Sequence, residues 1–253
     1  MTTLTAAAGT SARPITSLDR AWRIVRLHYQ SWRMSVLFPW VILVGILGVN
    51  LAIWYLIQYT THGTTMNTQY TGSIAYLFIY QLVLATQLMN ANFAFALGLS
   101  STRRDFSLGT ALFFVVQTAQ FTAGFVLLTY IEQWTNGWGI SGHMFQTVYV
   151  GTGPLWQRAF TVFFALLGCL FAGSILGAVF VRWRAYGLYV VFALAIAVLL
   201  AALALIGLTH SWVPVGEWFA RNRGFGVVAW SLPVTAACGV IGFLALRRAV
   251  PRG

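Results

Sequence analysis

Residues 188–207 read LYVVFALAIAVLLAALALIG and contain no charged side chain. An α-helix of about 20 apolar residues spans the roughly 30 Å of hydrocarbon in a bilayer. Tyr189 supplies the only polar side-chain atom of the stretch. The stretch therefore predicts a membrane-spanning helix, and its lack of polar atoms favours a position that faces lipid.

Five further apolar stretches of similar length lie elsewhere in the 253-residue chain. The chain is 59% hydrophobic and only 8% charged, which is far from the composition of water-soluble domains. We therefore predict an all-α fold, a polytopic membrane protein with six transmembrane helices. The predicted spans are residues 36–59, 73–99, 108–130, 159–181, 186–208 and 225–246. They form a domain over residues 36–246, flanked by a disordered tail at 1–16 and a short C-terminal tail at 247–253.

The arginines predict the orientation of these helices. The chain has fifteen arginines, no lysine and four carboxylates, and its formal net charge is +11. With the N-terminus inside, twelve arginines fall on the cytoplasmic side and three, Arg158, Arg221 and Arg223, fall outside. Membrane proteins concentrate positive charge on the cytoplasmic side. We therefore predict a bacterial plasma-membrane protein with both termini in the cytoplasm, and we attribute the positive charge to topology rather than to nucleic-acid binding.

Residues 17–33, SLDRAWRIVRLHYQSWR, precede the first predicted span. Helical spacing gathers their larger apolar side chains onto one stripe and lets the arginines project elsewhere. Helices of this kind lie in the plane of the membrane surface. We predict an amphipathic cytoplasmic-surface helix over residues 17–35, although Ile24 and Leu27 interrupt its polar face and favour packing against protein as well. The residues expected at the interface are Trp22, Arg23, Arg26 and Trp32.

Catalysis by this chain is not expected. A phosphate-binding loop of the G-x-x-x-x-G-K-[ST] type needs a lysine, and the chain has none, so any ATP must be bound by another subunit. The predicted spans contain no carboxylate and no histidine. The two cysteines, Cys169 and Cys238, lie far apart in apolar stretches and read as packing residues. We therefore assign no catalytic residue, metal site or cofactor to this chain.

Amide side chains occur in the second and third predicted spans. Gln87 and Asn90 lie in the second and Gln117 and Gln120 in the third, all at a similar depth. An amide in hydrocarbon needs a hydrogen-bond partner, so these helices must contact each other, a second copy or a wet cavity. Two interpretations stay open: the four residues line a translocation path, or they hold helices together.

The fourth predicted span carries a ridge of small side chains. Cys169, Gly173 and Gly177 are spaced four residues apart, which places them on one helix face. A ridge of this kind lets another helix approach closely.

A short charged break separates the second and third predicted spans, in LGLSSTRRDFSLGTALFF at residues 97–114. Topology alone explains two arginines on an inner turn. It does not require the aspartate, the phenylalanine and the serines beside them. A capped short helix here presents two guanidinium groups and a phenyl ring to the cytoplasm, where a soluble partner can bind them. The residues are Ser100 or Ser101 as the cap, followed by Arg103, Arg104, Asp105 and Phe106.

The pattern Gly98-Leu-Ser-Ser-Thr-Arg-Arg-Asp-Phe-Ser-Leu-Gly109 resembles the cytoplasmic coupling segment of ABC-type exporter permeases. The similarity is to the type-2 family, whose ATPase is a separate polypeptide. The predicted layout also resembles that family: an amphipathic N-terminal helix, six spans with both ends inside, and a longer outer segment between the fifth and sixth spans. The outer loop at residues 131–158 is longer than is typical.

The resemblance implies an assembly of two permease subunits, identical or paralogous, with two cytoplasmic ATPase subunits that hold ATP and Mg²⁺. It implies that Arg103, Arg104, Asp105 and Phe106 dock the ATPase. It also implies export of an amphipathic cargo such as a drug, an antibiotic peptide or a lipid.

Two other functions stay open. In a non-transporting membrane scaffold or assembly protein, the polar residues of the spans only hold helices together. A secondary transporter is disfavoured, because the predicted spans lack an acid or histidine to carry protons. Membrane lipids are expected partners in every case.

Overall fold

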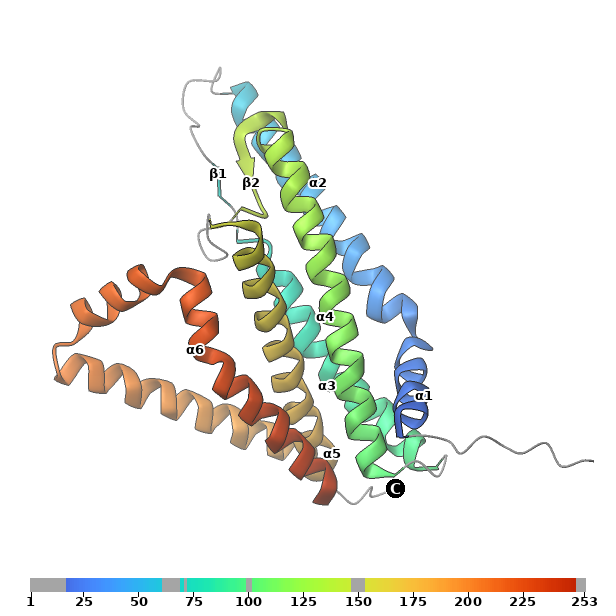
Figure 1. Ribbon diagram of the computed structural model, residues 1–253. Helices are drawn as coiled ribbons and strands as arrows, with labels where there is room; N and C mark the ends of the chain where they lie inside the picture. The colour runs from blue at the N-terminus through green and yellow to red at the C-terminus, as the bar shows by residue number, and fades with distance from the viewer. Residues whose placement is uncertain (1–16, 61–68, 71, 99–101, 147–152, 249–253) are drawn as a thin grey trace, which may run out of the picture.

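The computed structural model describes residues 17–60, 69–70, 72–98, 102–146 and 153–248. Nearly all of these residues are helical (Figure 1), which confirms the predicted all-α class. The predicted tail at 1–16 and most of the one at 247–253 lie outside the described residues. The helices are α1 (Ser17–Tyr29), α2 (Phe38–Thr60), α3 (Ala75–Gly98), α4 (Arg103–Trp134), α5 (Leu155–Leu208) and α6 (Trp212–Arg248), with π-helical turns η1 (Arg33–Leu37) and η2 (Gly137–Ser141).

Helix α4 is the central element of the bundle. Five of its phenylalanines are at most 1% exposed, and their helical spacing places them on the faces that meet other helices. One group packs with α1, α3 and α5, and the other packs with α2, α3, α5 and the segment after η2. The whole core is therefore assembled along α4. The first group contains Phe106, Phe113 and Phe114, and the second contains Phe121 and Phe125.

Helix α3 packs mainly against α5, and two glycines allow the close approach. A Cβ atom on Gly173 would lie 2.2 Å from the Leu82 carbonyl oxygen, and one on Gly177 would lie 2.5 Å from Met89 Cβ. The Thr86 hydroxyl donates a hydrogen bond of 3.0 Å to the Gly173 carbonyl across the same contact. The predicted small-residue ridge is confirmed, and its partner is α3.

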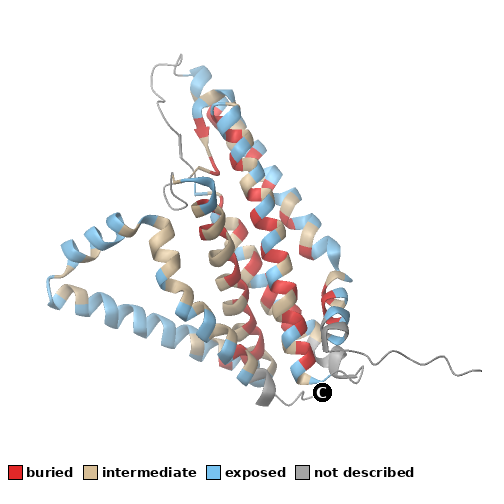
Figure 2. Cartoon of the chain, viewed as in Figure 1, coloured by how far each residue is buried: buried red, intermediate tan, exposed pale blue. Residues whose placement is uncertain are grey.

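Helix α5 contains two of the six predicted spans. Its 54 residues would extend about 80 Å if straight, which exceeds the thickness of a bilayer. Arg184, with φ 56° and ψ −148°, breaks the helix, and the second half leaves the bundle (Figure 1). Most residues beyond this bend are exposed, as Figure 2 shows. The predicted inner loop at 182–185 is therefore reduced to one non-helical residue.

Helix α6 bends in the same way and returns to the bundle (Figure 1). Its break lies at Arg223, with φ 47° and ψ −164°. Most of the predicted outer loop at 209–224 is therefore helical, because α6 begins at Trp212.

Four helical stretches of the described chain are long and apolar enough to cross a membrane, which supports a membrane protein. Six separate spans, with their orientation, remain a prediction. The four stretches are Arg33–Thr60, Arg103–Trp134, Leu155–Leu208 and Trp212–Leu244.

Helix α1 lies against the first turns of α4 (Figure 1). Ile24, Val25 and His28 are buried in this contact, whereas Trp22 and Trp32 are 46% and 51% exposed. The expected packing of Ile24 against protein is confirmed, and Val25 and His28 are buried on the same face while both tryptophans stay exposed. The helix also ends at Tyr29, before the predicted limit at residue 35. A position on the membrane surface remains a prediction.

Candidate functional site

The basic end of α4 is the first part of the candidate site. Thr102 is the N-cap, and its hydroxyl oxygen accepts a hydrogen bond of 3.1 Å from the Asp105 amide. The same hydroxyl donates to the Asp105 carboxylate at 2.7 Å. This reciprocal arrangement, with an acid in the first turn, stabilises the helix start. It fixes the direction in which Arg103 and Arg104 leave the helix.

Two details of the predicted coupling segment are wrong. The arginines belong to the first turn of a continuous 32-residue helix rather than to a separate short helix. The cap is Thr102, and the predicted caps Ser100 and Ser101 lie outside the described residues. The T-x-x-D spacing of Thr102 and Asp105 is a capping pattern that was visible in the sequence.

Helix α1 braces this end of α4 by an ion pair. Arg20 Nε lies 3.7 Å from Asp105 Oδ2, with the arginine side chain 52% exposed and the carboxylate 11% exposed. Asp105 therefore serves the start of α4 and the contact with α1 at the same time. An exposed pair of this kind contributes little energy by itself. Its role is to orient α1 against the basic end.

The two arginines differ in exposure. Arg104 is exposed, and Arg103 is partly buried. Both line a cavity of about 400 Å³, together with Ser107 and Phe243 of α6. The basic end of α4 is therefore open to a partner or a ligand at this position.

Phe106 does not face outward as predicted. It is 0% exposed and packs against His28 with the ring centres 5.8 Å apart. The prediction that its ring is presented to the cytoplasm is wrong, because the position falls on the buried face of α4. Phe106 anchors α1, and Arg104 is the residue that reaches outward.

His28 joins α1 to two other helices. Its Nε2 lies 3.0 Å from the Thr110 hydroxyl, and its Nδ1 lies 2.8 Å from Asn92 Nδ2. The ring also packs on Phe113, at 5.0 Å between centres. Burial lowers the pKa of His28 from 6.5 to about 4, since the charged form would be removed from water. His28 is therefore neutral near pH 7 and ties α1 to α3 and α4.

The residues predicted for the membrane interface are all exposed. Trp22, Arg23 and Arg26 belong to α1, and Trp32 follows the end of that helix. Their exposure leaves them available to a membrane surface or to a partner.

The four amides predicted to line a translocation path have different surroundings. Gln117 is 0% exposed, accepts a hydrogen bond of 3.3 Å from the Tyr29 hydroxyl and donates to the Ser35 carbonyl. It therefore holds the segment between α1 and α2 against α4. Gln87 is exposed and Gln120 is partly buried. The buried Oδ1 of Asn90 has no hydrogen-bond partner among the residues that the structure describes. The interpretation as interhelical contacts describes Gln117 well.

Other polar side chains are buried without partners in the middle of α3 and α4. Both amide atoms of Gln81 and the hydroxyl oxygens of Thr118 and Thr122 have no hydrogen-bond partner in the described part of the chain. A polar group isolated in an apolar environment costs several kcal/mol, on the order of 2–7. These positions therefore favour a polar ligand or a wet space within the bundle.

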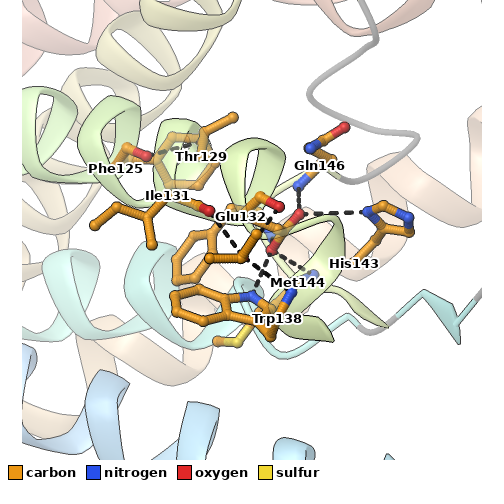
Figure 3. Close-up of polar contacts among 10 residues, drawn as sticks. Phe125, Thr129, Ile131, Glu132, Trp138, His143, Met144 and Gln146 are labelled. Carbon is orange, nitrogen blue, oxygen red and sulfur yellow. Dashed lines mark hydrogen bonds and ion pairs between the residues drawn. The ribbon is translucent and has the colours of Figure 1, made fainter. Parts of the chain in front are cut away.

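Glu132 organises the opposite end of α4. Its side chain is 0% exposed and lies at the centre of a set of donors from the following loop (Figure 3). Oε2 accepts hydrogen bonds of 3.0 Å from the amides of Met144 and Phe145 and of 3.2 Å from Trp138 Nε1. Oε1 accepts one of 3.0 Å from the Gln146 amide.

The loop held by Glu132 needs this anchor, because it has an irregular backbone. Asn136 and Trp138 have φ 49° and 61°, a region that residues other than glycine rarely adopt. The short strand β2 (Gly142–His143) pairs in parallel with β1 (Gln69–Tyr70) and joins this loop to the segment before α3. A single carboxylate therefore links the far end of α4 to the loop between α4 and α5.

Sequence reasoning missed three residues of these two sites: His28, Thr102 and Glu132. Glu132 could have been noticed in the sequence, because the chain has only four acids. An isolated acid beside a glycine-rich loop needs hydrogen-bond donors, and the backbone amides of that loop can supply them. His28 carried no such signal, because its partners are distant in the sequence. Among the residues that the structure describes, no group of three or more His, Cys, Asp or Glu is placed to hold a metal ion.

Comparisons of this chain with protein-family models, with curated proteins and with solved structures gave no match.

Proposed function

We propose that this chain is the transmembrane permease subunit of an ATP-driven exporter of the ABC type. In this proposal it lies in a bacterial plasma membrane with both termini in the cytoplasm. Two permease chains, identical or paralogous, work with two cytoplasmic ATPase subunits, which bind ATP and Mg²⁺. This chain transmits movement and moves the cargo, and it hydrolyses nothing itself.

The observation that carries the proposal is the braced basic end of α4. A cap at Thr102 and an ion pair from Arg20 fix its geometry, and Arg104 stands exposed beside them. Guanidinium groups held in a fixed direction suit bidentate pairing with carboxylates of a protein partner. An anchor that serves topology alone does not require this bracing.

The second support is mechanical. Helix α4 is an unbroken helix of 32 residues, about 48 Å long, with the arginines at one end and Glu132 at the other. Because its middle is held by buried phenylalanines, a displacement of the basic end moves the whole helix against its neighbours. The loop fixed to Glu132 moves with it. This is the connection that coupling of ATP hydrolysis to an outer gate requires.

Two adjoining cavities support an amphipathic cargo. The cavity beside Arg103 and Arg104 shares Ser107 and Phe243 with a second one of about 350 Å³. The second lies among α4, α5 and α6, and its lining is mostly apolar, with Phe114 and Phe171 among its residues. A ligand that extends through both would meet guanidinium groups at one end and apolar side chains at the other.

In this proposal, the second half of α5 and the helix α3 are added to the four apolar stretches, which gives six spans. The two halves on either side of Arg184 correspond to separate apolar stretches, each long enough to cross a bilayer. The end of α6 and the start of α4 lie at the same end of the molecule as α1 (Figure 1). Termini on one side of the membrane require an even number of crossings, so this arrangement excludes five crossings and is compatible with six.

Charge reversal at the basic end tests the proposal. We expect Arg103→Glu plus Arg104→Glu to abolish co-purification of an ATPase with a phosphate-binding lysine, while the permease stays folded in the membrane. The matched control is Arg221→Glu plus Arg223→Glu, two exposed arginines predicted to lie outside, which should retain the ATPase. Retention of the ATPase by both variants would contradict the proposal.

A membrane scaffold is the second candidate, and the contacts of Gln117 favour it. This amide forms hydrogen bonds with Tyr29 and Ser35, which is a structural role. A scaffold predicts that loss of the chain leaves resistance to amphipathic drugs and peptides unchanged. If the chain is an exporter, its loss should increase sensitivity to these compounds. The wild-type gene should restore resistance, and the Arg103→Glu plus Arg104→Glu variant should not.

A further inference from the structure

A cavity of about 910 Å³ lies at the bend of α5. Arg182 Cζ lies 4.6 Å from the centre of the Trp183 ring, within range of a cation–π contact. The cavity therefore combines cationic, aromatic and apolar surfaces at one position. The lining residues used below are Val179, Arg182, Trp183, Arg184, Tyr186 and Val190.

The backbone at Arg184 is strained. Its φ of 56° with ψ of −148° lies beside a region that is occupied almost only by glycine. An arginine there is strained, and glycine would form the same bend without that strain. The guanidinium group of Arg184 is placed at the cavity by this bend.

Among the side chains that the structure describes, no carboxylate balances the positive charge of the cavity. The chain has only four acids, and none of those described lines this cavity. Asp105 is paired with Arg20, and Glu132 is held by loop amides. Arg182 and Arg184 are both exposed, so an anion from outside the chain can reach them.

We propose that the bend of α5 binds an anionic phospholipid. The phosphate pairs with the guanidinium groups of Arg182 and Arg184, and Trp183 and Tyr186 lie beside the headgroup and glycerol. An acyl chain follows the valines of the wall, among them Val179 and Val190. Basic pockets between apolar helices at the cytoplasmic surface are suited to anionic headgroups, and indole and phenol rings favour the same depth.

This site is independent of the proposed export function. A free phosphate offers the same charge, but it leaves the valine wall and the two aromatic rings without a contact. The lipid is therefore the ligand that uses the whole lining.

The test uses the purified full-length chain in a neutral detergent, with three probes: dioctanoyl phosphatidylglycerol, dioctanoyl phosphatidylcholine and inorganic phosphate. Binding is measured by native mass spectrometry. We expect phosphatidylglycerol to bind at least tenfold more tightly than the other two probes. We expect Arg182→Gln plus Arg184→Gln to weaken its binding at least tenfold. Equal binding of inorganic phosphate, or of phosphatidylcholine, would overturn the proposal.

Two glycine variants separate the site from folding and from net charge. Arg184→Gly relieves the backbone and removes one charge, so the lipid-free melting temperature should be equal to or above that of the wild type while phosphatidylglycerol binding falls. Arg223→Gly makes the same change at the bend of α6 and should leave lipid binding unaltered. Equal weakening by both variants would show attraction by net charge only and would overturn the site. Loss of ATPase association with intact lipid binding in the Arg182→Gln plus Arg184→Gln variant would also overturn it, by identifying a protein-docking surface.

Discussion

Replacing Glu132 by glutamine changes the shape of the side chain very little and removes its charge. In the wild type, one carboxylate receives three backbone amides and one indole N–H. Glutamine has only one oxygen. If that oxygen takes the position of Oε2, with its three donors, then the amide NH₂ faces the Gln146 N–H and one hydrogen bond becomes a donor–donor contact.

The magnitude follows from these contacts. A hydrogen bond to a charged group contributes about 1.5–3 kcal/mol and one between neutral groups about 0.5–1.5 kcal/mol. Losing one charged bond and weakening three others by about 1–1.5 kcal/mol each costs about 4.5–7.5 kcal/mol in total. Relief of the penalty for burying a charge offsets part of this cost. We expect the docked loop to lose about 3 kcal/mol, which corresponds to roughly a hundredfold increase in its opening.

Hydrogen exchange of the detergent-solubilised chain measures this opening directly. The amides of Met144, Phe145 and Gln146 donate to the carboxylate, so they should exchange roughly a hundredfold faster in Glu132→Gln. The buried middle of α4, around Phe113 and Phe121, should keep its protection. Glu217→Gln is the matched control, because Glu217 is an exposed acid near the start of α6 and makes none of the contacts of Glu132.

Unchanged exchange rates at these three amides would show that the carboxylate does not hold the loop. If Glu217→Gln accelerates exchange of the same amides equally, the effect comes from the change in net charge and not from the contacts of Glu132. In the exporter proposal, Glu132→Gln should also uncouple ATP hydrolysis from transport, because the loop no longer follows α4.

Two further predictions concern the packing of the bundle. Gly173→Ala places a methyl group 2.2 Å from the Leu82 carbonyl oxygen and should destabilise the protein by about 1–3 kcal/mol despite its better helix propensity. Gly45→Ala, where nothing lies within 4 Å, should raise the melting temperature slightly or leave it unchanged, and the opposite order of the two variants would contradict the α3–α5 contact. The pKa of His28 is lowered to about 4 from 6.5, so the unfolded chain gains a proton before the folded chain does as the pH falls. Stability should therefore be complete above pH 6.5 and should fall by about 3 kcal/mol between pH 6.5 and pH 4. His28→Phe should flatten this dependence in thermal melts, and an unchanged slope would contradict the buried neutral histidine.

The apolar stretches could be located from the sequence because hydropathy over about 20 residues is a strong signal. Each predicted span falls within, or within two residues of, a helix of the structure. The connections were harder to predict, since a one-residue bend such as that at Arg184 depends on how two helices pack. The same limit explains the loop predicted at 209–224, most of which forms the first part of α6.

The candidate site was predictable only in its charged residues. Arg103, Arg104 and Asp105 stand out in a chain with few charges, and they do lie together at the start of α4. The direction of Phe106 could not be predicted, because it depends on the position of α1. His28 and Gln117 reach partners more than sixty residues away in sequence, and only the folded bundle brings these groups together.

The central claim is that the exposed arginine at the start of α4 contacts an ATPase. A photo-crosslinking amino acid at position 104, in the full-length chain in living cells, tests this contact directly. We expect a crosslink to a protein that carries a phosphate-binding lysine, and none from the same probe at position 221. Crosslinks from position 104 to lipid alone, or equal ATPase crosslinks from both positions, would contradict docking of an ATPase at this end of α4.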